Sequence, residues 1–394
     1  MKKIKPPELE IGLGLETYKS RSRGIGGRIK TNPEDFIVEE IIKDKRVLEI
    51  DSEMNFPVGD EKEYLHFTLQ KTNWDTLRAI REISNRLGIS KKRLNFAGTK
   101  DKRAITTQRV SVWKKTIEDL KKVGIKDIIL RDFQYSDKRI NLGDLWGNRF
   151  TVVIRDTNLG VNEIRERINR IEIELDGKMP NYFGVQRFGT TRPITHLVGR
   201  EILKCNFEEA VMIYLAKVFK GENDECKNAR QFLSETKDFK GALKRFPKYL
   251  GYENAMLNFL ANNPTDFVGT LRRLPKKLRL MFVHAYQSYI FNKSLSRYID
   301  GGMEIEELPL VGYNIEIDSI TSEIIDEEGI SQEFFRINPI PELSSEGSFR
   351  KCFVKFEDFN MLNCSNNELD IQFSLPRGSY ATVLLREFMK NQYW

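Results

Sequence analysis

Hydrophobic and polar positions alternate with the spacing of strands mainly toward the two ends of the chain. Val110 and Val112, for example, alternate with Arg109 and Ser111. This period of two is typical of a strand with one buried face. The segments with this pattern, or with a short β-rich run, are residues 31–42, 65–71, 94–97, 147–156 and the beginning of 369–391.

Helical periodicity dominates the middle of the chain and also occurs between the early strands. In residues 74–88 apolar side chains recur at helical spacing, and Gly88 supplies a stop signal. Residues 162–175 form a second amphipathic pattern. Residues 195–300 are mainly helical, with a clear run at 278–299.

This order of elements predicts an α+β protein. Strands at both ends and helices grouped between them suggest one domain that is interrupted by an inserted second domain. The length of 394 residues suits two domains of roughly 100–200 residues each. An apolar share of 40% is enough for packed cores.

The chain has a modest excess of positive charge, with a formal net charge of +7 and a pI of about 9.0. Residues 304–346 run against this excess, because they hold twelve acidic side chains and a single basic one, Arg336. The remaining chain is correspondingly more basic, which permits an acidic partner such as nucleic acid. We expect residues 304–346 to face away from any nucleic acid; an ordinary solvated surface is the alternative.

The cysteines and histidines give no support for a metal site. The four cysteines form no Cys-x-x-Cys pair, and the three histidines lie far apart in the sequence. Few cysteines and no export signal favour a cytoplasmic protein. No apolar run approaches the ~18 residues of a transmembrane helix. No Walker-type loop or dinucleotide-binding fingerprint occurs either.

The densest group of candidate functional side chains is the segment 98–103, GTKDKR. One carboxylate, Asp101, stands among three cations at the end of a predicted strand. The cations favour the ionised carboxylate and attract phosphate. Such a carboxylate is a plausible nucleophile toward a nucleotide. The alternative is a charged surface turn in which Asp101 caps the following segment.

Two further segments combine aromatic side chains with polar or basic ones. In the segment 148–150, the Phe150 ring can stack on a base while the Asn148 amide bonds to its edge, but Phe150 can equally be a core residue. Residues 182–189 interleave Arg187 with aromatic residues. That arrangement suits RNA binding or a packed domain junction.

Taken together, these segments resemble the TruD family of pseudouridine synthases. Five motifs occur in the family's order along most of the chain, and this combination is highly specific. The motifs are Lys30-x-Asn32-Pro33-Glu34-Asp35-Phe36-x-Val38-Glu39, Gly98-Thr99-Lys100-Asp101-Lys102-Arg103-Ala104-x-Thr106-x-Gln108, Gly147-Asn148-Arg149-Phe150, Pro180-Asn181-Tyr182-Phe183-Gly184-x-Gln186-Arg187-Phe188-Gly189 and Leu375-Pro376-x-Gly378-Ser379-Tyr380-Ala381-Thr382-x-x-x-Arg386-Glu387. Residues 72–76 depart from some family members, which affects only a local structural role.

The resemblance implies that the chain isomerises uridine to pseudouridine in tRNA, typically at uridine 13 of the D arm. The family's nucleophile is the Asp of the Gly-x-Lys-Asp motif, here Asp101. A Phe that lies against the target base matches Phe150, with Asn148 as its polar companion. A Lys that lies near the catalytic carboxylate matches Lys30. Glu39 matches a recurrent position without an assigned role.

The resemblance also implies a mixed β-sheet flanked by helices, as in other pseudouridine synthases but permuted. We expect a catalytic domain of residues 1–189 and 356–394 and an inserted, family-specific TRUD domain of residues 190–355. No metal or cofactor is expected, because the isomerisation retains all atoms of the base, and no membrane is expected, because the chain has no long apolar run. The oligomeric state is not readable. The residues expected to contact tRNA phosphates are Lys100, Lys102, Arg103 and Arg187.

At this stage the mechanism and the substrate both have alternatives. Asp101 assists cleavage of the N1–C1′ bond either by attacking C1′ or by removing the C2′ proton. A non-catalytic RNA-binding protein or chaperone would use the same basic and aromatic surfaces, but it has no need for a lone carboxylate in a cationic turn. The same chemistry on another RNA, such as rRNA or mRNA, would depend on the cleft and the inserted domain.

Overall fold

The structure, a computed structural model, describes residues 4–391, which form two compact units. We call residues 20–179 with 354–391 the sheet unit, and residues 4–19 with 180–353 the helical unit. The sequence-based boundary lies after residue 189, whereas by contacts the helical unit begins at Pro180 and also includes the N-terminal segment.

Both segments pack on α11 (Lys276–Asp300), the long helix of the helical unit. Tyr182 and Ser296 share a hydrogen bond of 3.0 Å between their hydroxyl groups. The Ser296 hydroxyl also donates to the Gly14 carbonyl at 2.8 Å. Asn292 donates to the carbonyl groups of Leu13 and Phe183, at 3.0 Å in each case. Polar side chains of one helix therefore hold both segments in place.

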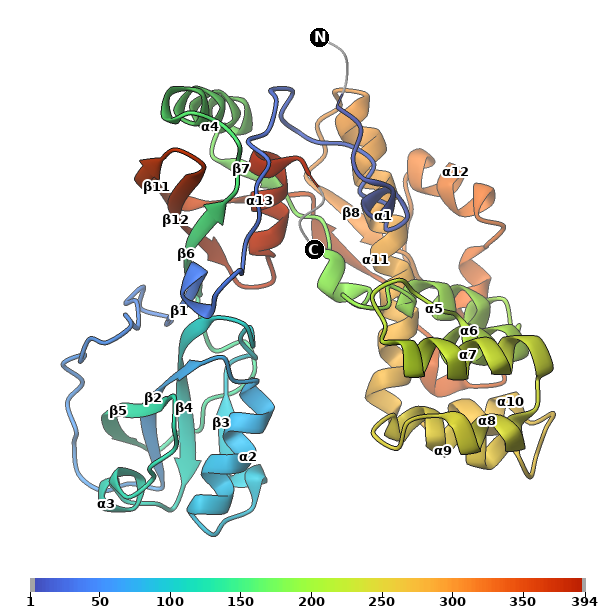
Figure 1. Ribbon diagram of the computed structural model, residues 1–394, viewed down its shortest axis with the longest axis horizontal. Helices are drawn as coiled ribbons and strands as arrows, with labels where there is room; N and C mark the ends of the chain where they lie inside the picture. The colour runs from blue at the N-terminus through green and yellow to red at the C-terminus, as the bar shows by residue number, and fades with distance from the viewer. Residues whose placement is uncertain (1–3, 392–394) are drawn as a thin grey trace. The chain divides into compact units, whose positions relative to one another are not determined.

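The sheet unit is built on an eight-stranded mixed sheet (Figure 1). The strand order is β11-β12-β6-β1-β4-β2-β5, and β3 pairs with β4. β1 and β4 are parallel, with Ile37 opposite Ile105, and the other neighbours are antiparallel. The strands are β1 (Phe36–Ile41), β2 (Tyr64–Thr72), β3 (Leu94–Phe96), β4 (Ile105–Trp113), β5 (Ile128–Ser136), β6 (Gly147–Arg155), β11 (Glu357–Ser365) and β12 (Glu368–Pro376).

Helices cover this sheet because their apolar residues recur along one stripe. In α2, for instance, Ile80 and Ile83 pack with Phe67 of β2 and Val110 of β4 in one buried cluster. Asp75 begins α2 by accepting a hydrogen bond from the backbone N–H of Arg78 at 3.0 Å. The helical segments of the unit are η1 (Pro33–Asp35), α2 (Thr76–Arg86), η2 (Lys91–Arg93), α3 (Ile117–Lys121), α4 (Val161–Leu175) and α13 (Ala381–Met389).

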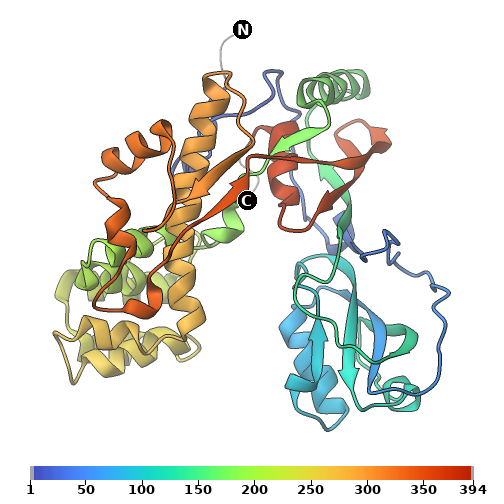
Figure 2. The ribbon, with the colours of Figure 1, turned by 180° about the vertical axis from the view of Figure 1, so that it is seen from behind.

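The helical unit is organised around the long helix α11 (Figure 2). Residues along most of the length of α11 are buried. A two-stranded antiparallel ribbon of β8 and β9 accompanies the helices. The elements are α1 (Glu8–Ile11), η3 (Val185–Arg187), α5 (Thr195–Leu203), α6 (Phe207–Ala216), α7 (Asp224–Thr236), α8 (Phe239–Arg245), α9 (Gly251–Leu260), α10 (Phe267–Leu271), β8 (Glu307–Leu310), α12 (Ser319–Glu327), η4 (Gln332–Phe335), η5 (Pro341–Leu343) and β9 (Ser348–Lys351). β7 (Lys178–Pro180) and β10 (Phe353–Lys355) lie where the chain passes between units.

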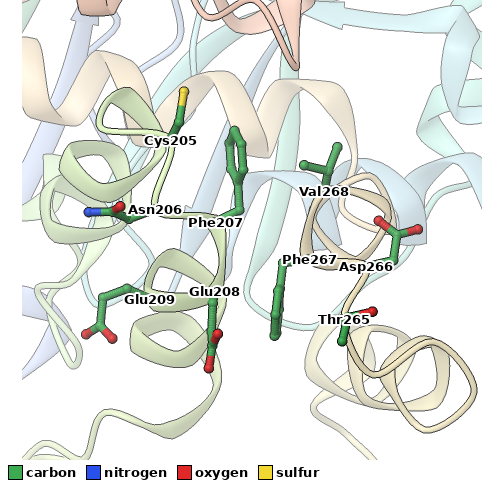
Figure 3. A pocket seen from close by; sticks show the side chains of 9 residues that line it. All are labelled: Cys205, Asn206, Phe207, Glu208, Glu209, Thr265, Asp266, Phe267 and Val268. Atoms are coloured by element: carbon green, nitrogen blue, oxygen red, sulfur yellow. The ribbon is translucent and has the colours of Figure 1, made fainter.

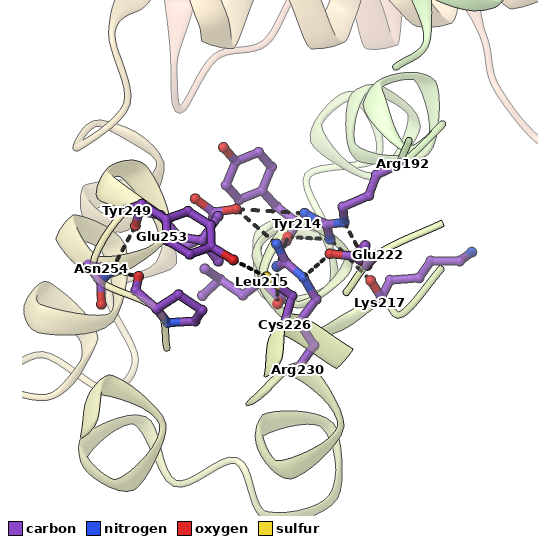
Figure 4. Close-up of polar contacts among 12 residues, drawn as sticks. Arg192, Tyr214, Leu215, Lys217, Glu222, Cys226, Arg230, Tyr249, Glu253 and Asn254 are labelled. Atoms are coloured by element: carbon purple, nitrogen blue, oxygen red, sulfur yellow. Dashed lines mark hydrogen bonds and ion pairs between the residues drawn. The ribbon is translucent and has the colours of Figure 1, made fainter. Parts of the chain in front are cut away.

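A buried ion network joins the helices of the helical unit (Figure 4). Arg230 of α7 is 1% exposed and contacts Glu222 at 2.7 Å and Glu253 of α9 at 3.0 Å. It also donates to the carbonyl of Leu215 in α6 at 2.7 Å. Arg192 lies 3.3 Å from Glu222, and burial lowers the pKa of this guanidinium to about 10. Buried charges are tolerated when every one has a partner, so the network fixes α6, α7 and α9 relative to one another.

The α+β class and the mixed sheet are confirmed, but the sequence pattern misses two strands of the eight-stranded sheet. β5 and β11 stand at the two ends of the strand order. An edge strand has a single neighbour, and every position of β11 is exposed or half-buried. Without a buried face, β11 lacks the alternation of apolar and polar residues that identifies a strand.

Candidate active site

Asp101 lies in the loop between β3 and β4, and its side chain is 37% exposed. Its carboxylate accepts a hydrogen bond from the ammonium of Lys30 at 2.6 Å. Lys30 has a φ of 58°, a left-handed conformation that few residues other than glycine adopt. Its ammonium also lies 4.0 Å from the centre of the Phe36 ring. The ammonium that contacts the Asp101 carboxylate is thus itself held over the Phe36 ring.

Hydrogen bonds from the sheet and from α2 hold the main chain of this loop. The Gln108 amide donates to the carbonyl of Gly98 at 3.0 Å. The backbone N–H of Lys100 donates to the Thr76 hydroxyl at 3.0 Å. The carbonyl of Asp101 accepts from the ammonium of Lys71 at 2.8 Å. Three backbone groups of residues 98–101 therefore have partners before any substrate binds, which favours a preorganised site.

Lys100 points into the protein rather than toward solvent. Its side chain is 4% exposed and its ammonium lies 2.8 Å from a carboxylate oxygen of Glu40, which is fully buried. The same ammonium donates to the Asn148 side-chain oxygen at 2.5 Å. The expectation that Lys100 contacts phosphate does not fit this geometry, because both contacts are internal. Lys100 instead ties the Asp101 loop to β1 and β6.

Phe150 lies on β6 within a row of aromatic rings. It stacks on Phe373 with ring centres 5.4 Å apart and meets Phe36 edge to face at 6.1 Å. Only 6% of Phe150 is exposed. The structure therefore gives Phe150 the packing of a core residue, one of the two roles left open by the sequence. Phe36 contacts both Phe150 and the ammonium of Lys30, and Lys30 in turn contacts the Asp101 carboxylate.

Glu39, whose role the sequence leaves open, has a structural environment. It is 3% exposed and accepts a hydrogen bond from Arg149 at 2.7 Å. It also accepts from the backbone N–H of Ile50 at 2.9 Å. Arg149 reaches Glu49 at 2.9 Å on its other side. Glu39 is thus engaged in holding β1, β6 and the segment around residue 50 together.

The remaining cations occupy different environments. Lys102 and Arg103 are exposed in the Asp101 loop, and Arg103 donates to the carbonyl of Thr31 at 2.7 Å. Arg187 belongs to the helical unit, where it donates to the Ser288 hydroxyl at 3.1 Å. Of the expected phosphate contacts, only Lys102 and Arg103 are therefore exposed beside Asp101.

Several residues of the site were not identified from the sequence. Glu40, Lys71 and Thr76 contact the Asp101 loop from β1, β2 and α2. Glu40 and Lys71 lie in segments predicted to be strands, but strand periodicity does not show which polar residue is buried against a loop. Gln108 belongs to the same motif as Asp101, which was the only available signal for its contact with Gly98.

A pocket of about 540 Å³ lies in the helical unit, between the beginnings of α6 and α10 (Figure 3). The carboxylates of Glu208, Glu209 and Asp266 line it beside Phe207 and Phe267. Acidic lining repels phosphate. A second hollow of about 720 Å³ lies in the sheet unit and is lined in part by basic side chains, though not by Asp101.

Within residues 4–391, no three His, Cys, Asp or Glu side chains gather as metal ligands would. None of the helices in this range has the length and apolar character that crossing a bilayer would require. The four cysteines are free thiols.

Comparison with known proteins gives one consistent result. A family model described as tRNA pseudouridine synthase D (TruD) matches residues 12–311 and 307–388. A protein of Methanosarcina acetivorans named "Probable tRNA pseudouridine synthase D" is similar to this chain, with 38% identity over 446 aligned positions that cover 99% of this chain and 98% of the relative. A protein of Methanocaldococcus jannaschii, "Probable tRNA pseudouridine synthase D 1", is 42% identical over 387 positions, covering 93% of this chain and 96% of the relative.

A solved structure shows the same similarity at the level of the fold. It is a crystal structure from Methanosarcina mazei that bears the name tRNA pseudouridine synthase D (TruD). Its TM-score is 0.82 at 37% sequence identity, and the match covers 100% of this chain and 99% of that chain. The similarity therefore extends over both units.

Proposed function

We propose a target and a mechanism for this chain from the premise that it belongs to the TruD family of tRNA pseudouridine synthases. The chain is an isomerase that converts uridine to pseudouridine in tRNA. The proposal is that the target is uridine 13 and that Asp101 is the nucleophile. The contact of 2.6 Å between Lys30 and the partly exposed carboxylate of Asp101 is the observation that supports Asp101 as the nucleophile, whereas uridine 13 rests on the resemblance to the family.

The reaction begins when the target nucleotide leaves its stack, because the glycosidic bond is otherwise out of reach. The ionised Asp101 then assists cleavage of the N1–C1′ bond, by attacking C1′ or by removing the C2′ proton. The freed uracil rotates, C5 bonds to C1′, and the proton on C5 is lost while N1 gains one. Every atom of the base is retained, so the step needs no oxidant, reductant or ATP.

Asn148 and Phe150 hold the base in this proposal. The Asn148 side-chain oxygen already accepts from Lys100, so its NH₂ group is left to donate to a uracil carbonyl. Phe150 is packed on Phe373, and it can meet a base only with the small part of its ring that is exposed. In this proposal Phe150 therefore touches the base with one edge of its ring, and the base does not stack on a large exposed surface of the ring.

The RNA backbone is held by exposed cations in this proposal. Lys102 and Arg103 flank Asp101 on the loop and are suited to phosphates near the target nucleotide. Arg187 is proposed as a phosphate contact of the helical unit. Lys100 is left out, because its ammonium is engaged by Glu40 and Asn148. We also propose that the enzyme works in the cytoplasm, which four free thiols support.

The decisive experiment compares Asp101→Asn with the unmodified enzyme on a tRNA transcript. Asp101→Asn should abolish pseudouridine formation while the affinity for tRNA stays nearly unchanged. Asp127→Asn is the matched control, because Asp127 is exposed in the same unit and its φ of 62° suits asparagine. Mapping the product locates the target: pseudouridine at a position other than 13, or only in another RNA, rejects uridine 13. If Asp101→Asn still forms pseudouridine, the proposal that Asp101 is the nucleophile is rejected.

A further inference from the structure

Lys71 lies beneath the Asp101 loop, on the β2 strand of the sheet. It is 0% exposed. Its ammonium donates to the carbonyl of Asp101 at 2.8 Å and to the carbonyl of Trp74 at 2.7 Å. Within residues 4–391, no carboxylate oxygen lies within 4.0 Å of this ammonium, the distance limit for an ion pair. Lys71 is therefore a buried cation whose hydrogen-bond partners are backbone carbonyl groups.

Burying an ammonium without a carboxylate partner costs free energy. A residue that carries this cost is expected to have a specific role. Burial lowers the pKa of Lys71 to about 8, while the charges of Asp101 and Asp75 act in the opposite direction and that of Lys100 adds to the lowering. A methionine of similar length would fill the same space without this penalty. The feature that a methionine lacks is a donor for the two carbonyl groups.

The two carbonyl groups belong to two segments that meet at the site. Trp74 lies in the turn before α2, and Asp101 lies in the loop between β3 and β4. The backbone N–H of Asn73 in this turn also donates to the carbonyl of Ala104 at 3.0 Å. The turn and the loop are thus joined at both ends of residues 101–104, with Lys71 at the Asp101 end.

We propose that Lys71 is a positioning residue of the isomerisation, which fixes the main chain of Asp101 so that its carboxylate meets Lys30 and the target nucleotide. Asp101 is then held at two points, at its carbonyl by Lys71 and at its carboxylate by Lys30. The inference rests on the proposed function, since a positioning role requires that Asp101 reacts. A displacement of about 1 Å at a reacting group can reduce a rate on the order of 100-fold.

The test is the single-turnover rate at saturating tRNA, together with tRNA affinity and thermal stability. Lys71→Met should lower the rate by about 100-fold and leave the affinity unchanged. Lys71→Arg should recover part of the rate, because a guanidinium again donates to the two carbonyl groups. Lys126→Met, which removes an exposed lysine of the same unit, is the control and should match the unmodified enzyme. A Lys71→Met rate within about two-fold of the unmodified enzyme would overturn the inference.

The pH profile keeps the inference testable if Lys71→Met does not fold. The rate of the unmodified enzyme should fall as the pH rises through about 8, because Lys71 then loses its charge and the two hydrogens that remain bind the carbonyl groups more weakly. The charged groups that face Lys71 are Asp101 and Lys100 from the loop and Asp75 from the turn. Uridine also loses a proton in alkaline solution, so Lys71→Arg, which stays protonated, is the comparison. An unchanged alkaline fall in Lys71→Arg would overturn the inference.

The outcomes also separate this inference from the proposed function. If Asp101→Asn is inactive and Lys71→Met is fully active, Asp101 remains the nucleophile and only the role of Lys71 fails. If Asp101→Asn is active, the proposed nucleophile fails whatever Lys71 does. A purely structural role for Lys71 would lower thermal stability while the rate per folded molecule stays the same.

Discussion

The ammonium of Lys30 lies 2.6 Å from a carboxylate oxygen of Asp101, although the two residues are 71 positions apart in the chain. Lys30 reaches this position from the segment that precedes β1, whereas Asp101 lies between β3 and β4. The parallel pairing of β1 with β4 places the beginnings of both strands at one edge of the sheet. The pair is therefore a product of the sheet topology.

Lys30→Met should lower the single-turnover rate on the order of 100-fold, because the Asp101 carboxylate loses the cation that orients it. The tRNA affinity should change little, since Lys30 faces Asp101 and Phe36. Lys30→Arg should retain more activity than Lys30→Met. Equal rates for Lys30→Met and the unmodified enzyme would show that Asp101 needs no partner.

Phe150→Leu separates base contact from core packing. Leucine keeps most of the apolar volume between Phe36 and Phe373, so the free energy of unfolding should change by less than about 1.5 kcal/mol. Because Phe150→Leu removes the ring that contacts the base, its rate at saturating tRNA should be about ten-fold lower than that of the unmodified enzyme. Phe373→Leu is the control from the same stack. If both variants slow the reaction equally, the effect comes from packing and Phe150 does not contact the base.

Glu40→Gln should destabilise the sheet unit by about 3–5 kcal/mol, because it leaves the buried Lys100 ammonium without its carboxylate. Urea unfolding followed by circular dichroism measures this change. The double variant Glu40→Gln with Lys100→Met should recover most of the loss, since neither of the two positions then carries a buried charge. Additive losses in the double variant would mean that the two side chains do not act as a pair.

Affinity for tRNA should fall steeply with salt, because phosphate contacts release counterions. Lys102→Ala and Arg103→Ala should each reduce the slope of log affinity against log salt by about one. Lys126→Ala, on an exposed turn of the same unit, serves as the comparison and should leave the slope unchanged. Unaltered slopes in the two loop variants would place the phosphates elsewhere.

Acid should weaken the helical unit through His196, which is 4% exposed. Burial, with Arg200 and Lys217 nearby, lowers the pKa of His196 from 6.5 to about 4. The unfolded chain therefore binds the extra proton between pH 6.5 and 4, and stability is lost as the pH falls through this window. The loss should be about 3 kcal/mol in urea unfolding. His196→Phe keeps a ring against Phe188 and Tyr289, and should show a correspondingly smaller loss.

The sequence identified those features that depend on local pattern. Helix α2 followed from the spacing of Ile80 and Ile83, and it ends at Arg86, two residues before the expected stop at Gly88, which has a φ of 63°. The charged turn around Asp101 was identified by its composition alone. Lys30 was named only through the family motif, because its own neighbours carry no sign of a partner 71 residues away.

Only the tertiary structure decided which charged groups are buried and which face solvent. Lys100 and Lys102 are both cations beside Asp101 in the sequence, yet Lys100 is paired with Glu40 in the interior and Lys102 is exposed. Lys71 has the pattern of an ordinary strand residue until the fold places the Asp101 carbonyl over it. Periodicity determines which face of an element is apolar, whereas the partner of a buried charge comes from strands brought together by long-range pairing, which no local pattern encodes.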